Sequence, residues 1–299
     1  MANLKEVRTR INSVKSTQQI TKAMKMVSAA KLRKAQDAIT QMRPYAVSLQ
    51  KIIANLSANM DTNIGSTYTA QREPNKVLIV PITSDRGLCG TFNANIVKAS
   101  LAIVQERYAQ QLKAGNVQFL CIGNKGADSL TRKGYKVIPD FISTFQNLSF
   151  EKVKAVGEYI LQQFTQGEFD RVEVVYNEFK NVLTQIVRVQ QFLPVLPTEL
   201  EVNKQGNKKQ DKTEYIFEPS KEEIIEEMIP KSLKVQLYKS ILDSNASEQG
   251  ARMTSMDNAT NNAEALVKEL QLIYNKTRQA AITKEILEIV GGAEALKGA

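Results

Sequence analysis

Residues 256–287 read MDNATNNAEALVKELQLIYNKTRQAAITKEIL, and small or apolar residues recur along them at alternating spacings of three and four. This repeat is the heptad of a coiled coil, in which the recurring positions form a seam against a partner helix. Only Lys284 departs from the repeat, and its small residues would let the partner come close. The stretch therefore predicts a long helix with a seam of Met256, Ala259, Ala263, Leu266, Leu270, Ile273, Thr277, Ala280 and Leu287.

The partner of this helix is predicted at the other end of the chain. Residues 1–64 contain no glycine, and a second heptad begins at Leu4. A stutter near Gln18 should shift the apolar positions. A kink or local break is expected at Pro44, because proline cannot donate the helical hydrogen bond. The predicted seam comprises Leu4, Val7, Ile11, Val14, then Ile20, Met24, Val27, and then Ala29, Ala30, Ala35 and Ala38.

The middle of the chain, residues 75–197, alternates between strand and helix patterns. Such alternation is typical of a mostly parallel, three-layer α/β domain of the Rossmann-like kind. The predicted strands are Lys76–Ile82, Val117–Ile122, Tyr135–Ile138, Arg171–Asn177 and Thr184–Gln190, the last antiparallel to its neighbour, and the predicted helices are Asn93–Leu112, Lys125–Arg132 and Ser149–Phe164.

The whole chain is therefore predicted to be an α/β protein with long terminal helices. Two helices that enter and leave one domain on the same side run antiparallel, so the simplest structure is an antiparallel two-helix coiled coil. Ser220 has capping-box spacing with Glu223 before the second helix, and Pro230 is expected to break or restart it. The predicted segments are 1–60 (N-terminal helix), 75–197 (α/β domain), 198–219 (polar linker) and 220–299 (C-terminal helix).

Composition limits the possible functions. The 299 residues include no histidine, which excludes histidine-based triads and histidine-ligated metals and disfavours acid–base catalysis at neutral pH. Cys89 and Cys121 lack metal-ligand spacing and are expected to be buried. No run of 18 apolar residues could span a bilayer, and residues 1–5 do not resemble a secretory signal.

The net charge of +9 lies entirely in the first helix, where residues 1–57 hold eleven basic and two acidic side chains. Arg8, Lys15 and Lys22 recur every seven residues and so share a stripe. Either this helix has a simple solvated face, or its partner surface is acidic.

Two turns stand where a nucleotide-binding fold would hold a phosphate. Ser84–Gly90 (SDRGLCG) follows the first strand, but its glycine spacing fits neither phosphate-binding motif, so a tight turn or protein-contact loop is favoured over a nucleotide site. Asp85 and Arg86 are expected to form a local salt link or cap and not to act as catalytic groups. Gly123–Gly126 similarly predicts a helix-entry turn.

The C-terminal stretch 282–293 reads ITKEILEIVGGA and surrounds the predicted helix with apolar side chains. These residues either pack against the first helix or need a partner outside the chain, and their all-round distribution favours the outside partner. The apolar tip comprises Ile286, Leu287, Ile289 and Val290.

Together these segments resemble the gamma-subunit family of the F-type ATP synthases, in its bacterial form. The resemblance covers essentially the whole chain, and the family's C-terminal pattern I-T-x-E-x-x-E-x-x-x-G-A is matched at every fixed position of 282–293. It is densest at residues 20–27 (ITKAMKMV), 84–90, 248–256 (EQGARMTSM) and 269–293.

The resemblance implies a non-catalytic subunit that binds no cofactor and acts as the central shaft of the rotary motor. Its helices would stand in an alpha3beta3 hexamer, and its foot would contact the epsilon subunit and the membrane c-ring. It would couple proton transport to ATP synthesis on the cytoplasmic face of the bacterial inner membrane, touching the membrane only through the c-ring. The paired cysteines of the chloroplast form are absent, so no thiol switch is expected.

The resemblance also implies roles for particular residues. The apolar tip would turn in an apolar sleeve of the hexamer. The loop residues Ser84, Asp85, Arg86, Gly87 and Gly90 would lie at the foot, beside the epsilon subunit and the c-ring. Contacts that couple rotation to the beta subunit are implied for Lys22, Met24, Lys25, Arg252, Arg278, Gln279, Thr283 and Glu285.

Two other functions fit parts of the sequence. A basic coiled-coil protein that binds nucleic acid would use the cationic helix, although residues 1–57 offer only Tyr45 as an aromatic stacking residue. A nucleotide-dependent enzyme would need phosphate contacts at Ser84–Gly90.

Overall fold

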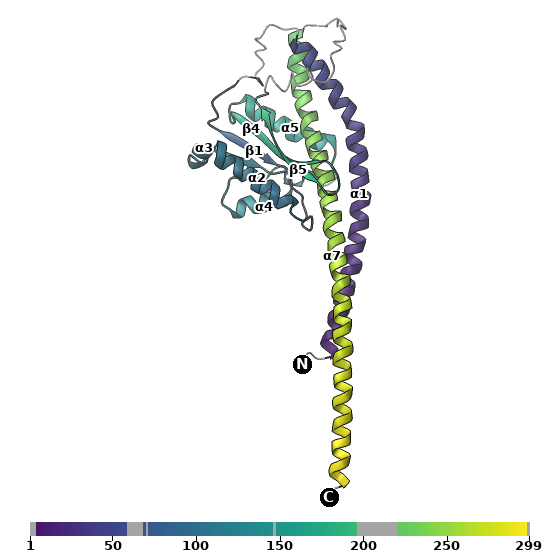
Figure 1. The fold of residues 1–299 in the computed structure, drawn as a ribbon. Coiled ribbons are helices and arrows are strands. Elements are labelled where there is room, and N and C mark those ends of the chain that lie inside the picture. Colours follow the sequence, from purple (N-terminus) through teal and green to yellow (C-terminus); the bar gives the residue numbers. More distant parts are fainter. Residues whose placement is uncertain (1–3, 59–67, 70, 146–147, 196–220, 298–299) are drawn as a thin grey trace. The chain divides into compact units, whose positions relative to one another are not determined.

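The computed structural model describes residues 4–58, 68–69, 71–145, 148–195 and 221–297. Two long helices, α1 (Leu4–Ala58) and α7 (Lys221–Lys297), begin and end the described chain (Figure 1). The chain divides into two compact units, one from residues 1–28 with 252–299 and one from residues 29–251. The predicted linker and the capping box at Ser220 lie outside the described residues.

The second unit contains a five-stranded sheet in the order β3-β2-β1-β4-β5. Neighbouring strands are parallel except for β5, which runs antiparallel to β4. The predicted mostly parallel α/β domain is thus confirmed, including the antiparallel last pair. The strands are β1 (Val77–Pro81), β2 (Val117–Leu120), β3 (Val137–Ile138), β4 (Arg171–Phe179) and β5 (Gln185–Leu193).

The helices of this domain follow the predicted ranges with one difference. The predicted helix Asn93–Leu112 is interrupted at Tyr108, whose hydroxyl donates a hydrogen bond to the buried carboxylate of Glu173. Since Glu173 lies on β4, this bond ties the end of α2 to the sheet. The helices are α2 (Phe92–Arg107), α3 (Ala109–Lys113), α4 (Asn124–Arg132), the 3-10 turn η1 (Ile142–Phe145) and α5 (Phe150–Thr165).

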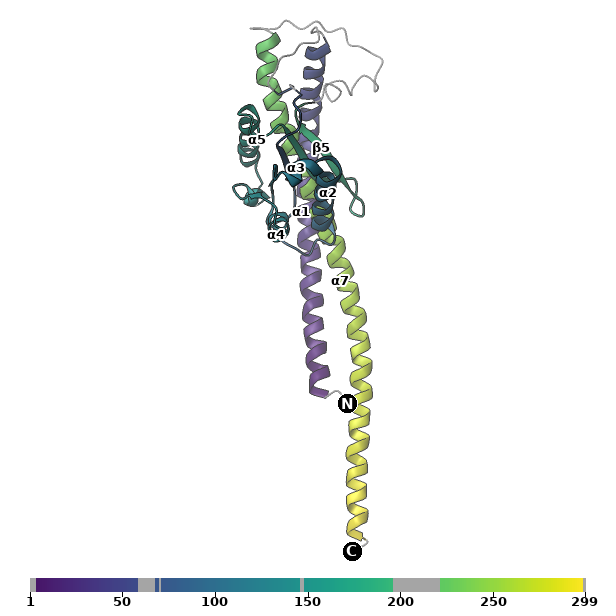
Figure 2. The same cartoon turned by 90° about the vertical axis from the view of Figure 1, so that its left-hand side faces the viewer.

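Side chains alternate along β1 and divide the core between two faces of the sheet. Ile79 packs toward α2 and α4, with Ile96 and Leu130 in the same cluster. Leu78 and Val80 point to the other face, where α5 is one cover; Figure 2 shows α5 and α2 on opposite sides of the strands. The core is therefore a three-layer sandwich, as predicted.

The second cover of that other face is α7 itself. Leu233, Leu237 and Ile241 are at most 3% exposed and belong to the same cluster as Val80. Burying each such side chain stabilises the fold by about 1.5–3 kcal/mol. This stretch of α7 was predicted only as part of a coiled coil, but it is also a layer of the α/β domain.

The prolines do not interrupt the long helices. α7 continues through Pro230, so the predicted break there is wrong, and the local break predicted at Pro44 of α1 does not occur either. A proline inside a helix costs about 3 kcal/mol or more. Ile229 and Leu233 flank Pro230 and are both buried against the sheet, and this packing opposes the local cost.

In the first unit, α1 and α7 form the predicted antiparallel pair. Val7 and Ile11 cluster with Leu270, and further along α1 the hydroxyl of Thr21 lies 2.8 Å from that of Thr260. Rising numbers on α1 therefore meet falling numbers on α7.

The seam of α1 does not shift at Gln18, so the predicted stutter is wrong. The heptad from Leu4 continues through Thr21 and Ser28, which are 8% and 2% exposed, whereas Ile20 and Val27 are 60% and 56% exposed. In a continuous paired helix the heptad position decides which side chain faces the partner, and here that position holds polar residues.

The seam of α7 agrees with the prediction at alternate positions as far as Leu270, whereas Leu287, the last predicted position, is 66% exposed. Met256, Ala263 and Leu270 are buried as expected. At the positions between these, Leu266 packs against the cluster of Val7, Ile11 and Leu270 as predicted, whereas Ile273 is 41% exposed and Tyr274 packs there in its place.

Candidate functional site

The strand order identifies where a doubly wound domain would bind a ligand. The chain passes from β1 to β2, which lies on one side of β1 in the sheet. On the other side of β1 lies β4. Ligands of such folds lie at the carboxyl ends of the strands, at this switch point. The segment from Thr83 to Gly90 follows β1 there, so it lies where a fold of this kind would bind a ligand.

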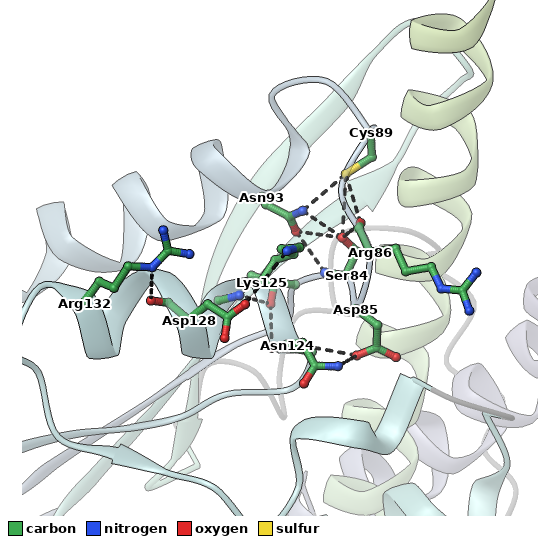
Figure 3. A network of polar contacts seen from close by, with 12 residues as sticks. Ser84, Asp85, Arg86, Cys89, Asn93, Asn124, Lys125, Asp128 and Arg132 are labelled. Carbon is green, nitrogen blue, oxygen red and sulfur yellow. Dashed lines mark hydrogen bonds and ion pairs between the residues drawn. The ribbon is translucent and has the colours of Figure 1, made fainter. Parts of the chain in front are cut away.

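The chain itself occupies the anion-binding end of α4. The first amides of that helix donate to residues that follow β1. Asn124 donates to Asp85 Oδ1 at 3.2 Å (Figure 3), Lys125 to the Ser84 carbonyl at 3.0 Å, and Gly126 to Thr83 Oγ1 at 2.9 Å. A phosphate would use the same amides. The two turns that the sequence predicts separately thus cap one another.

Close packing explains the glycines of the second turn. A Cβ on Gly123 would lie 2.1 Å from the Thr83 carbonyl oxygen, and one on Gly126 would lie 2.6 Å from Thr83 Oγ1. Gly123 also has a φ of 102°, which favours glycine. These glycines bring two protein segments together and do not form a phosphate cradle.

A second set of bonds fixes the loop Ser84–Gly90. Ser84 is fully buried, its hydroxyl donates to the Arg86 carbonyl at 2.7 Å, and Asn93 Nδ2 donates to that hydroxyl at 2.7 Å. Burial raises the pKa of the Asp85 carboxyl, and the hydrogen bond from the Asn124 amide opposes that shift. Asp85 therefore acts as the cap that was predicted.

The tip of this loop points outward. Leu88 is 65% exposed and has a φ of 64°, an unusual conformation for a large side chain. Arg86 is also exposed. An exposed tip with a strained backbone suits a functional contact with another protein.

The crevice at the switch point is filled by α7. Ser244 Oγ donates to the Ile82 carbonyl at 3.3 Å, and Ser247 Oγ donates to the Asn177 carbonyl at 3.1 Å. Both serines are fully buried, as is Ala246 between them. The helix therefore covers the ends of β1 and β4, where a nucleotide would otherwise lie.

The described residues offer little for catalysis. No group of three or more potential metal ligands occurs among them. Cys89 and Cys121 are both buried free thiols, as the sequence predicts, and burial raises the pKa of Cys121 to about 12. That thiol is therefore a poor nucleophile at neutral pH.

The residues implied for coupling fall into two groups. On α1, Lys22 is exposed and Met24 is half-buried, whereas Lys25 Nζ makes a 2.6 Å ion pair with Asp257 of α7. Lys25 is thus held by the seam, which the sequence did not indicate. Ile20 and Val27, seven residues apart on the exposed face of α1, lie in the same region and were predicted in the seam instead.

The second group lies on α7. Arg252 is buried, while the others lie beyond the last seam cluster, which ends at Tyr274, and are exposed. The hydroxyl of Thr283 donates to the Gln279 carbonyl at 2.9 Å. The exposed members are Arg278, Gln279, Thr283 and Glu285.

The end of α7 carries a run of exposed apolar side chains. The predicted tip residues Ile286, Leu287, Ile289 and Val290 are 54%, 66%, 71% and 53% exposed, and Ile282 is 48% exposed. The structure therefore does not pack them against α1, which was the alternative. A contiguous apolar surface of this kind marks an interaction site.

These features define a class: a subunit of a larger assembly that contains two long paired helices and an α/β domain whose ligand crevice is filled. The family described as ATP synthase matches residues 3–296. ATP synthase gamma chains from Cytophaga hutchinsonii and Flavobacterium johnsoniae are 57% and 55% identical to the chain, over 99% and 100% of both sequences. The chain belongs to the ATP synthase gamma chain family.

Solved structures agree with this membership. A chain of the Tetrahymena thermophila mitochondrial ATP synthase, from a structure of the central stalk and c-ring, is 29% identical with a TM-score of 0.56, over 80% of this chain and 99% of that one. A chain of the Euglena gracilis mitochondrial enzyme has the same fold, with a TM-score of 0.64 at 23% identity over 98% and 94% of the two chains. None of the described helices is long and apolar enough to cross a membrane.

Proposed function

We propose that this chain is the central stalk subunit of an F1Fo ATP synthase and couples ion flow through a membrane c-ring to ATP synthesis. The observation that carries the proposal is the exposed apolar end of α7, from Ile282 to Val290, in a member of the gamma chain family. An exposed apolar helix end of this kind marks a surface that a partner protein covers. The proposed partner is the alpha3beta3 hexamer, whose apolar sleeve would surround the end.

The mechanism needs no catalytic group on this chain. A shaft without threefold symmetry touches the three beta subunits differently at any moment, so it stabilises a different conformation of each. Rotation then changes which conformation each subunit favours, and nucleotide binding follows. The exposed side chains of the shaft would supply these differential contacts.

On α1, we assign the beta contact to Lys22 and Met24, with Ile20 and Val27 on the neighbouring exposed surface. An acidic segment of beta would complement the basic excess of this helix. Lys25 would act indirectly, because its ammonium is already paired with Asp257 and so positions the two helices.

On α7, Arg278 and Gln279 would donate hydrogen bonds to a loop of the beta subunit. Both are exposed beyond the last seam cluster, so their donors face outward from the helix. Thr283 and Glu285 lie within two turns of them and would belong to the same contact. Arg252, which is buried, would support this region from within the shaft.

The contact of Ser84–Gly90 with the c-ring and epsilon subunit stays a prediction, and the geometry of the domain argues against the c-ring. Ser244 and Ser247 of α7 bond the carboxyl ends of β1 and β4, so the loop lies toward the later residues of α7. The foot of the shaft would instead be the end where α7 begins. The epsilon subunit remains as the predicted partner of the loop.

The proposed location is peripheral, on the cytoplasmic face of the bacterial inner membrane, with the c-ring as the only membrane contact. The test is to purify the tagged chain from native membranes in mild detergent. Alpha, beta, epsilon and c subunits should co-purify in fixed ratio. If the chain comes without them and binds DNA with strong salt dependence, the nucleic-acid alternative replaces this proposal.

A further inference from the structure

Three elements of the second unit meet around one buried acidic side chain. α1, α7 and the β4–β5 hairpin share an apolar cluster that includes Leu32, Ala246 and Phe179, and a second cluster joins Leu49 of α1 to Val235 of α7. Asp243 lies on α7 between these two clusters and is only 8% exposed. The causes that shift its pKa are burial and the charges of neighbouring residues, and no hydrogen bond is among them.

Charged groups from each neighbouring element face Asp243. Lys239 on its own helix and Arg43 on α1 favour the ionised form, and Glu178 on β4 disfavours it. Arg188 of β5 pairs with Glu178 at 2.7 Å and weakens that repulsion. The charge of Asp243 also affects Tyr176 of β4, because it raises the pKa of the Tyr176 phenol.

A cavity reaches α7 about one turn before this acid, at Lys239 and Ser240, and Asp243 itself is not one of its lining residues. Its volume is about 110 Å³, and it is lined from α1 by Ala46 and Leu49, from the sheet by Tyr176 and Gln190, and from α7 by Ser232, Val235, Gln236, Lys239 and Ser240. At about 30 Å³ per molecule it has room for three or four waters, and its polar groups offer them hydrogen bonds. Tyr176 connects the two features, since it lines the cavity and interacts with Asp243.

We propose that Asp243 and this cavity form a proton-sensitive joint between the α/β domain and the two long helices. An ionised carboxylate in this place needs water, which the cavity admits, and the hydrated joint is looser. The protonated acid is neutral, needs no such solvation, and lets the three elements pack more tightly. The proton comes from solvent and returns to it, so no other reactant is required.

The direction of the effect follows from the pKa of Asp243. Burial, the largest cause, raises it from 3.8 to about 6. A carboxyl with a raised pKa holds its proton more tightly in the packed joint than in the opened one. Its stabilising contribution is therefore present below about pH 4 and is lost as the pH rises through about 6.

Hydrogen exchange of the full-length chain tests this joint, with rates corrected for the intrinsic effect of pH. Amides in 38–46 and 236–250 should open about tenfold more readily at pH 7.5 than at pH 5.0. This is the change expected for one carboxyl whose pKa is about 6 in the packed joint and 3.8 in the opened one. Asp243→Asn, which is neutral at every pH, should show equal protection at both pH values, at least as strong as that of the parent chain at pH 5.0. Asp37→Asn, an exposed change on α1, should behave like the parent chain.

The proposal is overturned if protection in these segments is independent of pH, or if Asp243→Asn retains the pH dependence of the parent. A carbon NMR titration gives a second measurement that does not depend on the variant's packing. The Asp243 carboxyl should titrate near pH 6, and a midpoint at or below pH 4 would exclude the joint. The importance of the joint for rotation rests on the proposed function, but both measurements use the chain without its partners, so the two ideas can fail separately.

Discussion

The finding that α7 is a layer of the α/β domain leads to a quantitative prediction for Ile241→Ala. Ile241 is fully buried in the cluster between α7 and the sheet. The substitution removes three carbon atoms, a loss of about 2.4 kcal/mol at about 0.8 kcal/mol per buried carbon. If the site does not collapse, a cavity of about 80 Å³ at about 24 cal/mol per Å³ adds about 2 kcal/mol. We expect the free energy of unfolding to fall by about 2.5–4.5 kcal/mol.

Ile286→Ala is the matched control, because it is the same chemical change on the same helix. Ile286 is 54% exposed, so the free energy of unfolding should change by less than about 0.5 kcal/mol. Urea unfolding of the full-length chain, followed by the near-ultraviolet circular dichroism of its tyrosines, measures both. If the two variants differ by less than about 1 kcal/mol, which is outside the range expected for a buried isoleucine, α7 does not form part of the domain core.

In the assembled enzyme, Ile286→Ala should have an effect that it lacks on the stability of the isolated chain. Ile286 is assigned to the surface that the hexamer covers, so its truncation should weaken retention of the chain by alpha and beta subunits. Dissociation of the tagged complex in rising salt and detergent provides the measurement. Retention equal to that of the parent chain would contradict the role assigned to the apolar tip.

Three further predictions concern other parts of the chain. Gly123→Ala should destabilise the domain by at least about 2 kcal/mol in urea unfolding, because the new Cβ would meet the Thr83 carbonyl and the φ of residue 123 is positive. A smaller cost would show that Gly123 does not approach Thr83 so closely. Asp257→Ala should cost only about 0.2–1 kcal/mol in the same assay, since its ion pair with Lys25 is about 40% exposed on both sides, and a cost above 2 kcal/mol would mean that the pair is a major stabiliser. Arg278→Ala combined with Gln279→Ala should slow ATP synthesis by membranes while leaving nucleotide affinity nearly unchanged, and unaltered synthesis would exclude their coupling role.

The sequence was sufficient to predict that the two ends pair and run antiparallel. It was misleading about the seam near Gln18, because the prediction followed hydrophobicity rather than heptad position. Thr21 and Ser28 are buried although polar, since their positions face α7, where Thr260 offers a hydroxyl partner. Val27 is exposed for the same geometric reason. Which of two adjacent residues faces the partner depends on the phase of the whole helix, and a local pattern does not fix that phase.

The predicted break at Pro230 failed for a related reason. The effect of proline on a helix is a local rule, and it is correct about the lost hydrogen bond. Whether the helix breaks depends also on what the flanking residues contact. Ile229 and Leu233 bury their side chains against a sheet whose most distant residue in the cluster, Leu78, lies 155 positions before Leu233, and only the folded structure shows that contact.

The two glycine-containing turns illustrate how far motif spacing can be used. The absence of a phosphate-binding motif at Ser84–Gly90 correctly favoured a turn, and Asp85 was correctly expected to be a cap. The cap's target was not predictable, because Asn124 lies 39 residues further on. The three bonds that join the turns depend on the parallel register of β1 and β2, which places both carboxyl ends at one edge.

Because α7 fills the switch point, this doubly wound domain holds a helix where a nucleotide-binding fold would hold its ligand. In a nucleotide-binding protein the crevice between β1 and β4 holds a ligand that comes and goes. Here Ser244 and Ser247 bond the backbone carbonyls at that place, and they belong to a helix that continues without interruption to the exposed apolar tip. A load on the tip would therefore reach the domain through one covalent helix and its buried face, without crossing a loop. Because Asp243 lies one residue before Ser244, the buried acid belongs to the same attachment, and its ionisation would act on the connection that a rotating shaft needs most.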